Sequence, residues 1–378
     1  MQRIGVLGGM MDPVHLGHLH AAKCALDAGV DRVLLAPCLH PAHREKPAAS
    51  AEQRMEMCRL AAQIDPRIEV SDIDLREGTC YAADTVRLLQ QRHPGDGICW
   101  ILGADKLPGL AQWHKAEELF SRCEFLVCPR PGYDAHLPVH GARITVLEGA
   151  ETAVSSSAVI RELRGLSDAE DLLPRSVARY IAENGLYQPD WEQTLRKYGM
   201  KDKRLRHTLG VRQTAVELAW LHGERMQAAA TAAMLHDIAK PLPLKDMLKL
   251  VKRYRLKLPE ELLTGENLLH GPLAAAIAER ELGVTDGAVL SAIACHTTGK
   301  AGMTRLDKVI FLADAIEPNR ADYPGLAEMR QLAKTDLDAA VLLSMRRTQE
   351  YVLARGLRLC GQTEQAIQDL IKQKEEQS

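Results

Sequence analysis

The chain has 378 residues, too many for one ordinary hydrophobic core, and its 46% hydrophobic and 26% charged residues are typical of a soluble globular protein with two domains or three. The formal net charge of -2 gives no electrostatic case for binding nucleic acid, and no apolar run is long enough to span a membrane. The 9 cysteines form no Cys-x-x-Cys pair and the first residues lead directly into a strand pattern, so we expect reduced thiols, no signal peptide and a cytoplasmic location.

The first half of the chain alternates strand and helix patterns. Strands are predicted over residues 3–9, 32–37, 68–75, 98–105 and 123–133, and helices over 15–29, 51–64 and 81–95. Such alternation predicts a parallel sheet covered by helices, with nucleotide sites at the carboxyl ends of the strands. From about Gly185 the chain has helix patterns only, with breaks at residues 241–243, 265, 283, 299–300 and 318. We therefore predict an α/β domain over 1–190 and an all-α domain over 195–373.

The turn after the first strand carries two glycines and two histidines. Gly8 and Gly9 let the backbone approach a phosphate closely, and the helix that follows offers unpaired N–H groups to an anion. His15 and His18 are three residues apart at the start of this helix, so both can face the same phosphates, either as protonated or as neutral donors. A glycine turn with two surface histidines is the alternative, and it would be preferred for an isolated His-x-x-His.

More cationic and hydroxyl side chains follow in chain order. His43, Arg44 and Lys46 lie in the loop after the second strand, and the serines of AVSSSAVIREL precede a helix that contains Arg161. Each feature alone is common in structural loops and helix caps. Together they place several anion-binding groups along one edge of the predicted sheet.

These motifs resemble a known family. G-G-x-x-D-P-x-H-x-G-H at residues 8–18 resembles the phosphate-binding motif of the nucleotidyltransferase superfamily, and ILGADKLPGLAQWHK, CPRPGY, SSAVIREL and LLPRSVARYIAENGLY resemble nicotinate mononucleotide adenylyltransferases, over residues 2 to 187. The resemblance implies a Rossmann-like fold that joins ATP, assisted by Mg2+, to nicotinate mononucleotide and releases pyrophosphate. It implies that His15 and His18 contact the ATP phosphates and act in catalysis. The residues that we assign to nucleotide or substrate binding in this domain are Gly8, Gly9, His43, Arg44, Asp105, Trp113, Ser156, Ser157 and Arg161.

Several positions depart from what this family usually has. Met10-Met11 replaces Thr-Phe, Arg44 replaces Lys, and Ala82 and Ala158 each replace Thr. Each missing hydroxyl removes one hydrogen bond worth about 0.5–1.5 kcal/mol, which slows a reaction without abolishing it.

The helical half carries metal-ligand side chains on apolar helix faces. His207 shares a stripe with Val211 and Leu218, and Asp314 shares one with Ile310, so these side chains point inward. A buried, unpaired histidine or aspartate is costly, and a metal centre would give all of them partners at once. Core histidines bonded to carbonyls, with Asp314 in an internal salt bridge, are the alternative. The six predicted ligands are His207, His236, Asp237, His270, His296 and Asp314.

The adjacent pair His236-Asp237 and the later Asp314 resemble the HD superfamily of metal-dependent phosphohydrolases. RHTLGVRQTA, AAMLHDIAK, LLHGPLAA and ACHTTGKAGMTRLDKVIFLADAIEPNR are similar to its symmetrical bis(5'-nucleosyl)-tetraphosphatases, over residues 195 to 370. The resemblance implies a di-iron site, with Mn or Zn as other metals that suit the ligands, that cleaves diadenosine tetraphosphate into two ADP. Asp237 is the expected bridge between the metals. Side chains that we expect to contact the polyphosphate are Lys240, Thr297 and Arg320.

Three hypotheses follow from these motifs. The first is a bifunctional enzyme with both activities; the second keeps only the hydrolase active and makes the first domain a nucleotide-binding or regulatory module. The third treats both halves as ligand sensors on an interaction scaffold, against which the complete ligand set argues. The expected partners are ATP, nicotinate mononucleotide and dinucleoside polyphosphates, with neither nucleic acid nor membrane, and a homo-oligomer is left open.

Overall fold

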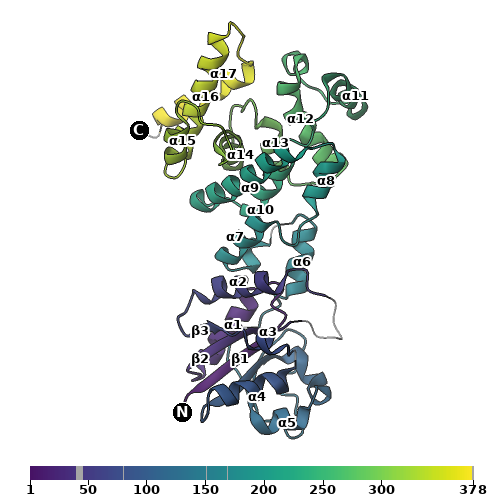
Figure 1. Cartoon of the computed structure of the whole chain (residues 1–378), viewed down its shortest axis with the longest axis vertical. Coiled ribbons are helices and arrows are strands. Elements are labelled where there is room, and N and C mark those ends of the chain that lie inside the picture. Colours follow the sequence, from purple (N-terminus) through teal and green to yellow (C-terminus); the bar gives the residue numbers. More distant parts are fainter. Residues whose placement is uncertain (40–45, 80, 150, 168, 377–378) are drawn as a thin grey trace. The chain divides into compact units, whose positions relative to one another are not determined.

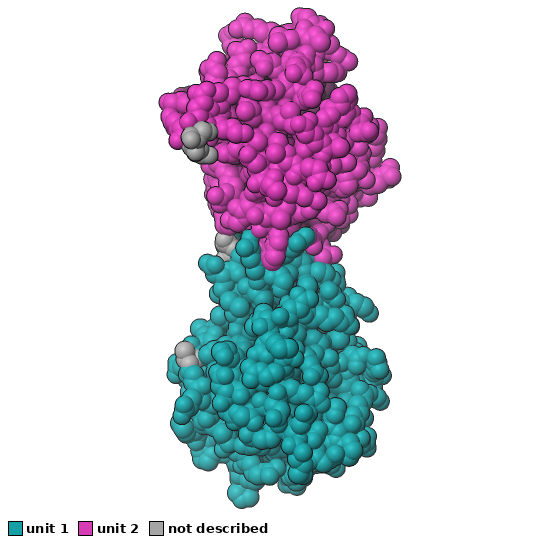
Figure 2. All heavy atoms as spheres, turned by 90° about the vertical axis from the view of Figure 1, so that its left-hand side faces the viewer, with its two compact units in different colours: residues 1–180 teal, residues 181–378 magenta. Residues whose placement is uncertain are grey.

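The computed structural model describes residues 1–39, 46–79, 81–149, 151–167 and 169–376. The chain divides into two compact units, Met1–Tyr180 and Ile181–Ser378 (Figures 1 and 2). The division falls within helix α7 (Arg175–Asn184). The predicted binding residues His43 and Arg44 lie outside the described residues.

Unit 1 is built on a six-stranded parallel sheet in the order β3-β2-β1-β4-β5-β6. Its strands are β1 (Arg3–Gly9), β2 (Arg32–Pro37), β3 (Ile68–Val70), β4 (Gly97–Gly103), β5 (Glu124–Cys128) and β6 (Ile144–Val146). Ile4 of β1 lies opposite Arg32 of β2 on one side and Ile98 of β4 on the other. The strand order reverses between β1 and β4, and ligands of such sheets bind beyond the carboxyl ends of the strands at this reversal.

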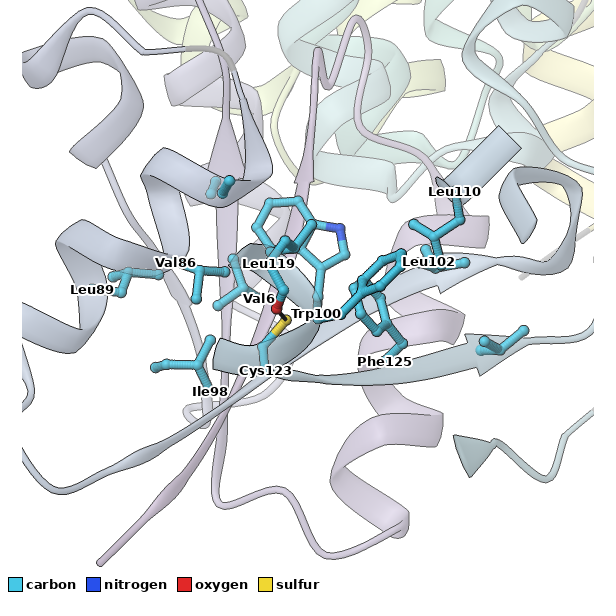
Figure 3. Packing of buried hydrophobic residues seen from close by; sticks show 14 of the residues in the cluster. Val6, Val86, Leu89, Ile98, Trp100, Leu102, Leu110, Leu119, Cys123 and Phe125 are labelled. Atoms are coloured by element: carbon cyan, nitrogen blue, oxygen red, sulfur yellow. Dashed lines mark hydrogen bonds between the residues drawn. The ribbon is translucent and has the colours of Figure 1, made fainter. Parts of the chain in front are cut away.

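Helices and short 3-10 turns connect the strands of unit 1. They are α1 (Leu16–Asp27), α2 (Ala51–Ala62), α3 (Ile73–Glu77), α4 (Ala82–Arg92), η1 (Ala104–Gln112), α5 (Ala116–Arg122), α6 (Ser156–Arg164) and η2 (Glu170–Leu172). Alternate side chains of the strands point to one face of the sheet, where Val6, Trp100 and Phe125 pack with Val86 of α4 and Leu119 of α5 (Figure 3). This core fixes the edge of the sheet from which the loop between β1 and α1 leaves.

Two predicted strands of unit 1 end earlier than expected, and one strand was not predicted. The strand predicted over 68–75 ends at Val70, because Asp74 belongs to α3, where it is buried and accepts a hydrogen bond from Thr85 Oγ1 of α4. The strand predicted over 123–133 ends at Cys128, since the following prolines cannot donate to a sheet. Strand β6 was not predicted, and its three residues include none that is buried.

The regular secondary structure among the described residues of unit 2 is entirely helical. The helices that follow α7 are α8 (Trp191–Lys197), α9 (Asp202–His222), α10 (Met226–Leu235), α11 (Leu244–Tyr254), η3 (Glu260–Thr264), α12 (Glu266–Arg280), α13 (Gly287–Cys295), α14 (Arg305–Ile316), α15 (Leu326–Leu332), α16 (Leu337–Ala354) and α17 (Gly361–Glu376). Every residue of α10 is buried, and this helix packs against α9, α13 and α14. A parallel α/β domain followed by an all-α domain is therefore confirmed. No helix in the described ranges combines the length and apolarity needed to cross a membrane.

Candidate active sites

The loop between β1 and α1, which we call the phosphate loop after its predicted role, forms the first candidate site. A Cβ atom added to Gly8 would lie 2.5 Å from the Trp100 ring, so this position admits glycine only, whereas a Cβ at Gly9 would meet no atom within 4 Å. Further along the loop, the Pro13 carbonyl accepts a hydrogen bond of 2.9 Å from Ser156 Oγ. The start of α6, which contains the second predicted phosphate motif, is thereby joined directly to the first.

His15 and His18 lie side by side at the start of α1. Their ring centroids are 3.8 Å apart, and the backbone N–H of His15 donates to Nδ1 of His18 at 3.2 Å. An Nδ1 that accepts a hydrogen bond leaves the proton on Nε2 of a neutral ring. Burial and, secondly, the charge of Arg130 lower the pKa of His15 to about 4, and burial followed by the neighbouring His15 holds the pKa of His18 well below its usual value. Of the two roles expected from the sequence, the structure therefore favours neutral hydrogen-bond donors.

The remaining predicted residues of unit 1 include two exposed side chains of α6 and one ion-paired aspartate. Ser157 is exposed at the first turn of α6, and the Arg161 side chain is 74% exposed, 3.7 Å from Glu162. Asp105 Oδ2 forms an ion pair with Lys106 at 2.5 Å, and its Oδ1 lies 3.7 Å from Arg130 Nε.

Trp113 lines a surface hollow. It follows η1 and borders a volume of about 470 Å³ together with Lys115 and Glu118. Lys115 also forms an ion pair with Asp84 of α4 at 3.3 Å. An indole beside an open volume offers a flat apolar surface to a ring.

The second candidate site lies inside unit 2, where the helices bring all six predicted ligands together. His207 comes from α9, His270 from α12 and Asp314 from α14, while His236-Asp237 directly follows α10 and His296 directly follows α13. His236, Asp237, His270 and His296 are each at most 2% exposed. The fully buried α10 explains this position, because the residues that follow it emerge in the interior of the bundle.

The two oxygens of Asp237 face different histidines. Oδ1 lies 3.2 Å from His270 Nε2 and 3.9 Å from His296 Nε2. Oδ2 lies 3.4 Å from His236 Nε2 and 3.8 Å from His207 Nε2. Two groups of nitrogen atoms thus share one carboxylate.

Asp314 belongs to one of these groups only. Its Oδ1 lies 3.0 Å from His207 Nε2 and 3.9 Å from His236 Nε2. His207, His236 and Asp314 form one cluster whose ligand atoms all lie within 4.8 Å of one another, and His236, Asp237 and His296 form another.

All four imidazoles present Nε2 to the centre of the site. Each Nδ1 faces an acceptor of its own: Glu317 Oε1 at 3.1 Å for His207, Ala233 O at 2.6 Å for His236, Glu266 O at 3.0 Å for His270 and Ile293 O at 2.8 Å for His296. A carbonyl oxygen only accepts, so Nδ1 carries the proton and Nε2 carries a lone pair.

Within this group of rings, the lone pairs of His270 and His296 face each other at 3.1 Å, and Nε2 of His207 and of His236 has no hydrogen-bond partner among the described residues. Converging lone pairs in a buried cluster fit a metal cation.

The ionisation of the cluster also suits a metal. Burial opposes charge on Asp237, but the facing His236 outweighs it and holds the pKa of the carboxyl well below its usual range. Burial opposes charge on Asp314 as well, and the adjacent His207 nevertheless lowers its pKa. Burial, then the neighbouring His236, lowers the pKa of His296 to about 3. Burial opposes charge on His236, but the facing Asp237 outweighs it and raises the pKa of this imidazole. Ionised carboxylates and neutral imidazoles are the forms that coordinate metals, so a metal bound at His236 Nε2 would displace a proton there.

Cationic side chains surround the carboxylates. Arg320, predicted to contact substrate, donates from Nη2 to Asp314 Oδ1 at 2.5 Å, and Lys240 lies 2.9 Å from Asn267 Oδ1 and 3.4 Å from His270 Nδ1. Arg204 pairs with Asp237 Oδ2 at 2.7 Å. Arg204 was not predicted from the sequence. It lies one turn before His207 on the same helix, and this spacing indicates that the two side chains are neighbours.

Thr297 is the last predicted substrate residue of unit 2. It directly follows His296, and its buried hydroxyl has no hydrogen-bond partner within the part of the chain that the structure describes. A buried hydroxyl of this kind is available to a bound ligand.

Comparisons with known proteins match both halves of the chain. A cytidylyltransferase-like family model matches residues 6–162, and an HD domain model matches residues 204–319. The chain is 31% identical, over 90% of its own length and 97% of the relative's, to the probable nicotinate-nucleotide adenylyltransferase/Ap4A hydrolase of Mycoplasma pneumoniae. The chain belongs to this two-domain family. The resemblance seen in the sequence motifs is thus confirmed for both halves.

Single-domain relatives match each half of this family member separately. Residues making up 42% of the chain are 42% identical to the symmetrical bis(5'-nucleosyl)-tetraphosphatase of Bacillus subtilis, over 85% of that protein. A segment that makes up 50% of the chain is 35% identical to the nicotinate-nucleotide adenylyltransferase of Bacillus subtilis, and the match covers 100% of that protein. The HD match and the ligand clusters together indicate a site for divalent metal in unit 2.

Proposed function

We propose that the chain is a bifunctional enzyme. Unit 1 transfers AMP from ATP to nicotinate mononucleotide and releases pyrophosphate, and unit 2 hydrolyses diadenosine tetraphosphate to two ADP. The observation that carries the proposal is the coexistence, in one chain, of the paired imidazoles at the phosphate loop and the buried cluster around Asp237. Relatives that bear both names in one protein support it.

In unit 1, the phosphate oxygen of nicotinate mononucleotide attacks the α-phosphorus of ATP as the bond to the leaving pyrophosphate breaks. No covalent enzyme intermediate is needed, because positioning and charge stabilisation suffice for in-line transfer. His18 donates from its Nε2–H group and His15 from a neutral ring to the phosphates, beside the open backbone of Gly9. Mg2+ accompanies ATP, and Trp113 stacks on the pyridine ring.

In unit 2, the donor set fits two metals, with iron, manganese and zinc as the chemically suitable ions. His207, His236, Asp314 and Asp237 Oδ2 would hold one, and His270, His296 and Asp237 Oδ1 the other. When bound, the metals supply hydroxide at neutral pH by lowering the pKa of water from about 15.7 to about 7.

Groups of this chain around the metal cluster would hold the polyphosphate. Arg204, Lys240 and Arg320 place positive charge beside the cluster, where phosphoryl oxygens bind. The Thr297 hydroxyl offers a hydrogen bond.

Product analysis on the intact chain tests both activities at once. The chain is purified anaerobically with ferrous iron and given diadenosine tetraphosphate in one assay, and ATP with nicotinate mononucleotide in the other. We expect ADP as the sole hydrolysis product, lost in Asp237→Ala and kept in His18→Ala. Synthesis of nicotinate adenine dinucleotide should show the opposite pattern.

Other outcomes contradict defined parts of the proposal. AMP plus ATP as products would exclude the symmetrical cut. If the chain hydrolyses diadenosine tetraphosphate but releases no pyrophosphate in the second assay, unit 1 is a binding or regulatory module. Met10-Met11, in place of the Thr-Phe usual in the family, would then explain the missing synthesis.

A further inference from the structure

Arg54 is a buried charged side chain behind the phosphate loop. It lies in α2 and is 2% exposed. Its Nη1 donates to the carbonyl oxygens of Met10 and Cys38, both at 2.6 Å, and its Nη2 donates to the carbonyl of Leu39 at 3.0 Å. Met10 directly follows β1, while Cys38 and Leu39 directly follow β2. One guanidinium thus holds the chain where it leaves two neighbouring strands, which needs the fixed fork geometry of arginine.

The charge of Arg54 is not neutralised by a carboxylate. None of the ion pairs among the described residues includes Arg54, and its partners are carbonyl oxygens only. Burying a cation without a counter-ion is costly, and an apolar side chain would fill the same volume at lower cost. The fold therefore retains a positive charge directly behind a loop proposed to receive an anion.

The bond to Met10 also determines where the next N–H points. In a trans peptide the C=O and the following N–H point in opposite directions. Because the Met10 carbonyl faces Arg54, the N–H of Met11 faces away from α2, and it has no hydrogen-bond partner among the described residues. A backbone N–H presented in this way is the kind of donor that binds phosphate oxygens.

Asp12 holds the same loop through a second set of hydrogen bonds. It is 4% exposed, and its carboxylate accepts from the backbone N–H groups of Ala48 at 2.7 Å and Ala49 at 3.1 Å. Together with the bond from Ser156 to Pro13, three positions of the loop are fixed, at residues 10, 12 and 13.

We propose that Arg54 is a positioning residue for adenylyl transfer, which fixes the loop between β1 and α1 in the shape that receives the ATP phosphates, with Asp12 as its counterpart. The proposal rests on the function proposed for unit 1. It is specific to the ATP end of the site, because the Met10 carbonyl that Arg54 holds belongs to the phosphate loop, and none of the hydrogen bonds of Arg54 reaches the segment around Trp113.

The test uses Arg54→Met, Arg54→Lys and a control, Arg59→Met, in the full chain. Arg59 lies on the same helix, but its side chain is 57% exposed and pairs only with Glu56 on the surface. Initial rates of dinucleotide synthesis are measured with each substrate varied in turn. Hydrolysis of diadenosine tetraphosphate by the same preparation normalises the amount of intact chain.

We expect Arg54→Met to raise the KM for ATP about tenfold or more, because a small misplacement of binding groups is costly, while the KM for nicotinate mononucleotide stays unchanged. The KM of Arg54→Lys for ATP should lie between those of Arg54→Met and the wild type, because lysine keeps the charge and loses the planar set of guanidinium donors. Arg59→Met should match the wild type. Asp12→Asn, which keeps only part of the acceptor capacity, should show the same ATP-specific effect.

A loss of kcat in proportion to the folded fraction, with both KM values unchanged, would overturn the proposal, because a purely structural role predicts that result. Calorimetric binding of ATP with Mg2+ to each variant gives an independent readout and should show the same order of affinities. Equal ATP affinity in the wild type and Arg54→Met would also overturn it. A wild type that binds ATP but forms no dinucleotide would contradict the proposed function and not this inference.

Discussion

Gly210 of α9 is the position at which a single added methyl group tests the geometry of the metal cluster. A Cβ atom there would overlap Glu317 Oε2 and lie 2.8 Å from Asn319 Nδ2. Glu317 is 1% exposed, and it accepts from His207 Nδ1 at 3.1 Å and from the Asn319 N–H at 2.6 Å. In Gly210→Ala the Glu317 carboxylate must move, and His207 loses the group that fixes its ring.

The sign of the change in the free energy of unfolding distinguishes displacement of Glu317 from the usual gain in helix propensity. In an ordinary helix interior, Gly→Ala raises the free energy of unfolding by about 1 kcal/mol. Loss of a hydrogen bond to a charged group lowers it by about 1.5–3 kcal/mol. We therefore expect Gly210→Ala to lower the free energy of unfolding by about 0.5–2 kcal/mol. Metal affinity should fall about 10–100-fold, as it does when the partner of a metal-binding histidine is removed.

Gly287→Ala is the matched control for this variant. Gly287 begins α13, and a Cβ there would meet no atom within 4 Å. Urea unfolding of the metal-free chain gives the stability change, and calorimetric titration with Mn2+ gives the affinity. The reasoning is refuted if Gly210→Ala is as stable as Gly287→Ala and binds Mn2+ as the wild type does.

Three further predictions concern charge. Arg204→Gln removes the guanidinium 2.7 Å from Asp237, so Mn2+ should bind at least as tightly as in the wild type while the KM for diadenosine tetraphosphate rises about tenfold; parallel losses of both would contradict this. Burial raises the pKa of Asp74 from 3.8 to about 6, so the folded state binds the proton more tightly than the unfolded state, and stability should fall by about 3 kcal/mol as the pH rises from about 4 to about 6. Asp74→Asn should remove this part of the pH dependence of urea unfolding, and an unchanged profile would exclude Asp74 as its source. Because His15 and His18 are neutral, kcat for dinucleotide synthesis should not rise as the pH is lowered from about 8 to about 6.5, and a rise would indicate a protonated imidazole.

The ligand cluster of unit 2 could be predicted because helical periodicity reports which side chains point inward. His207 and Asp314 lie on apolar stripes, and the structure places their side-chain atoms 3.0 Å apart. Arg204 was not predicted, although it lies one turn before His207 on the same helix. On the first turns of α9 it has the same sequence signature as a solvated arginine, and its partner Asp237 is 33 residues away in the chain.

In unit 1, apolar runs predicted the strands that are buried, and local sequence did not report what only tertiary packing determines. The three residues of β6 are stabilised by pairing with β5, and residues 73–77 become helical as Asp74 bonds to Thr85 of α4. Arg54 lies in a helix with polar residues on several sides, so its burial depends on loops that the helix pattern does not contain.

Three of the four imidazoles in the metal cluster of unit 2 are oriented by carbonyls only three or four residues earlier in the chain, as in the bond from His236 Nδ1 to Ala233 O. Ring orientation at these positions is therefore encoded within single helical turns, and the distant sequence has only to bring the turns together. Because carbonyls of the same helices hold these three rings, their orientation does not depend on a metal, and little conformational entropy is lost when the rings become ligands. The imidazole and carboxylate ligands held in this way suit iron, manganese and zinc alike, so the donor atoms by themselves do not select one of these ions.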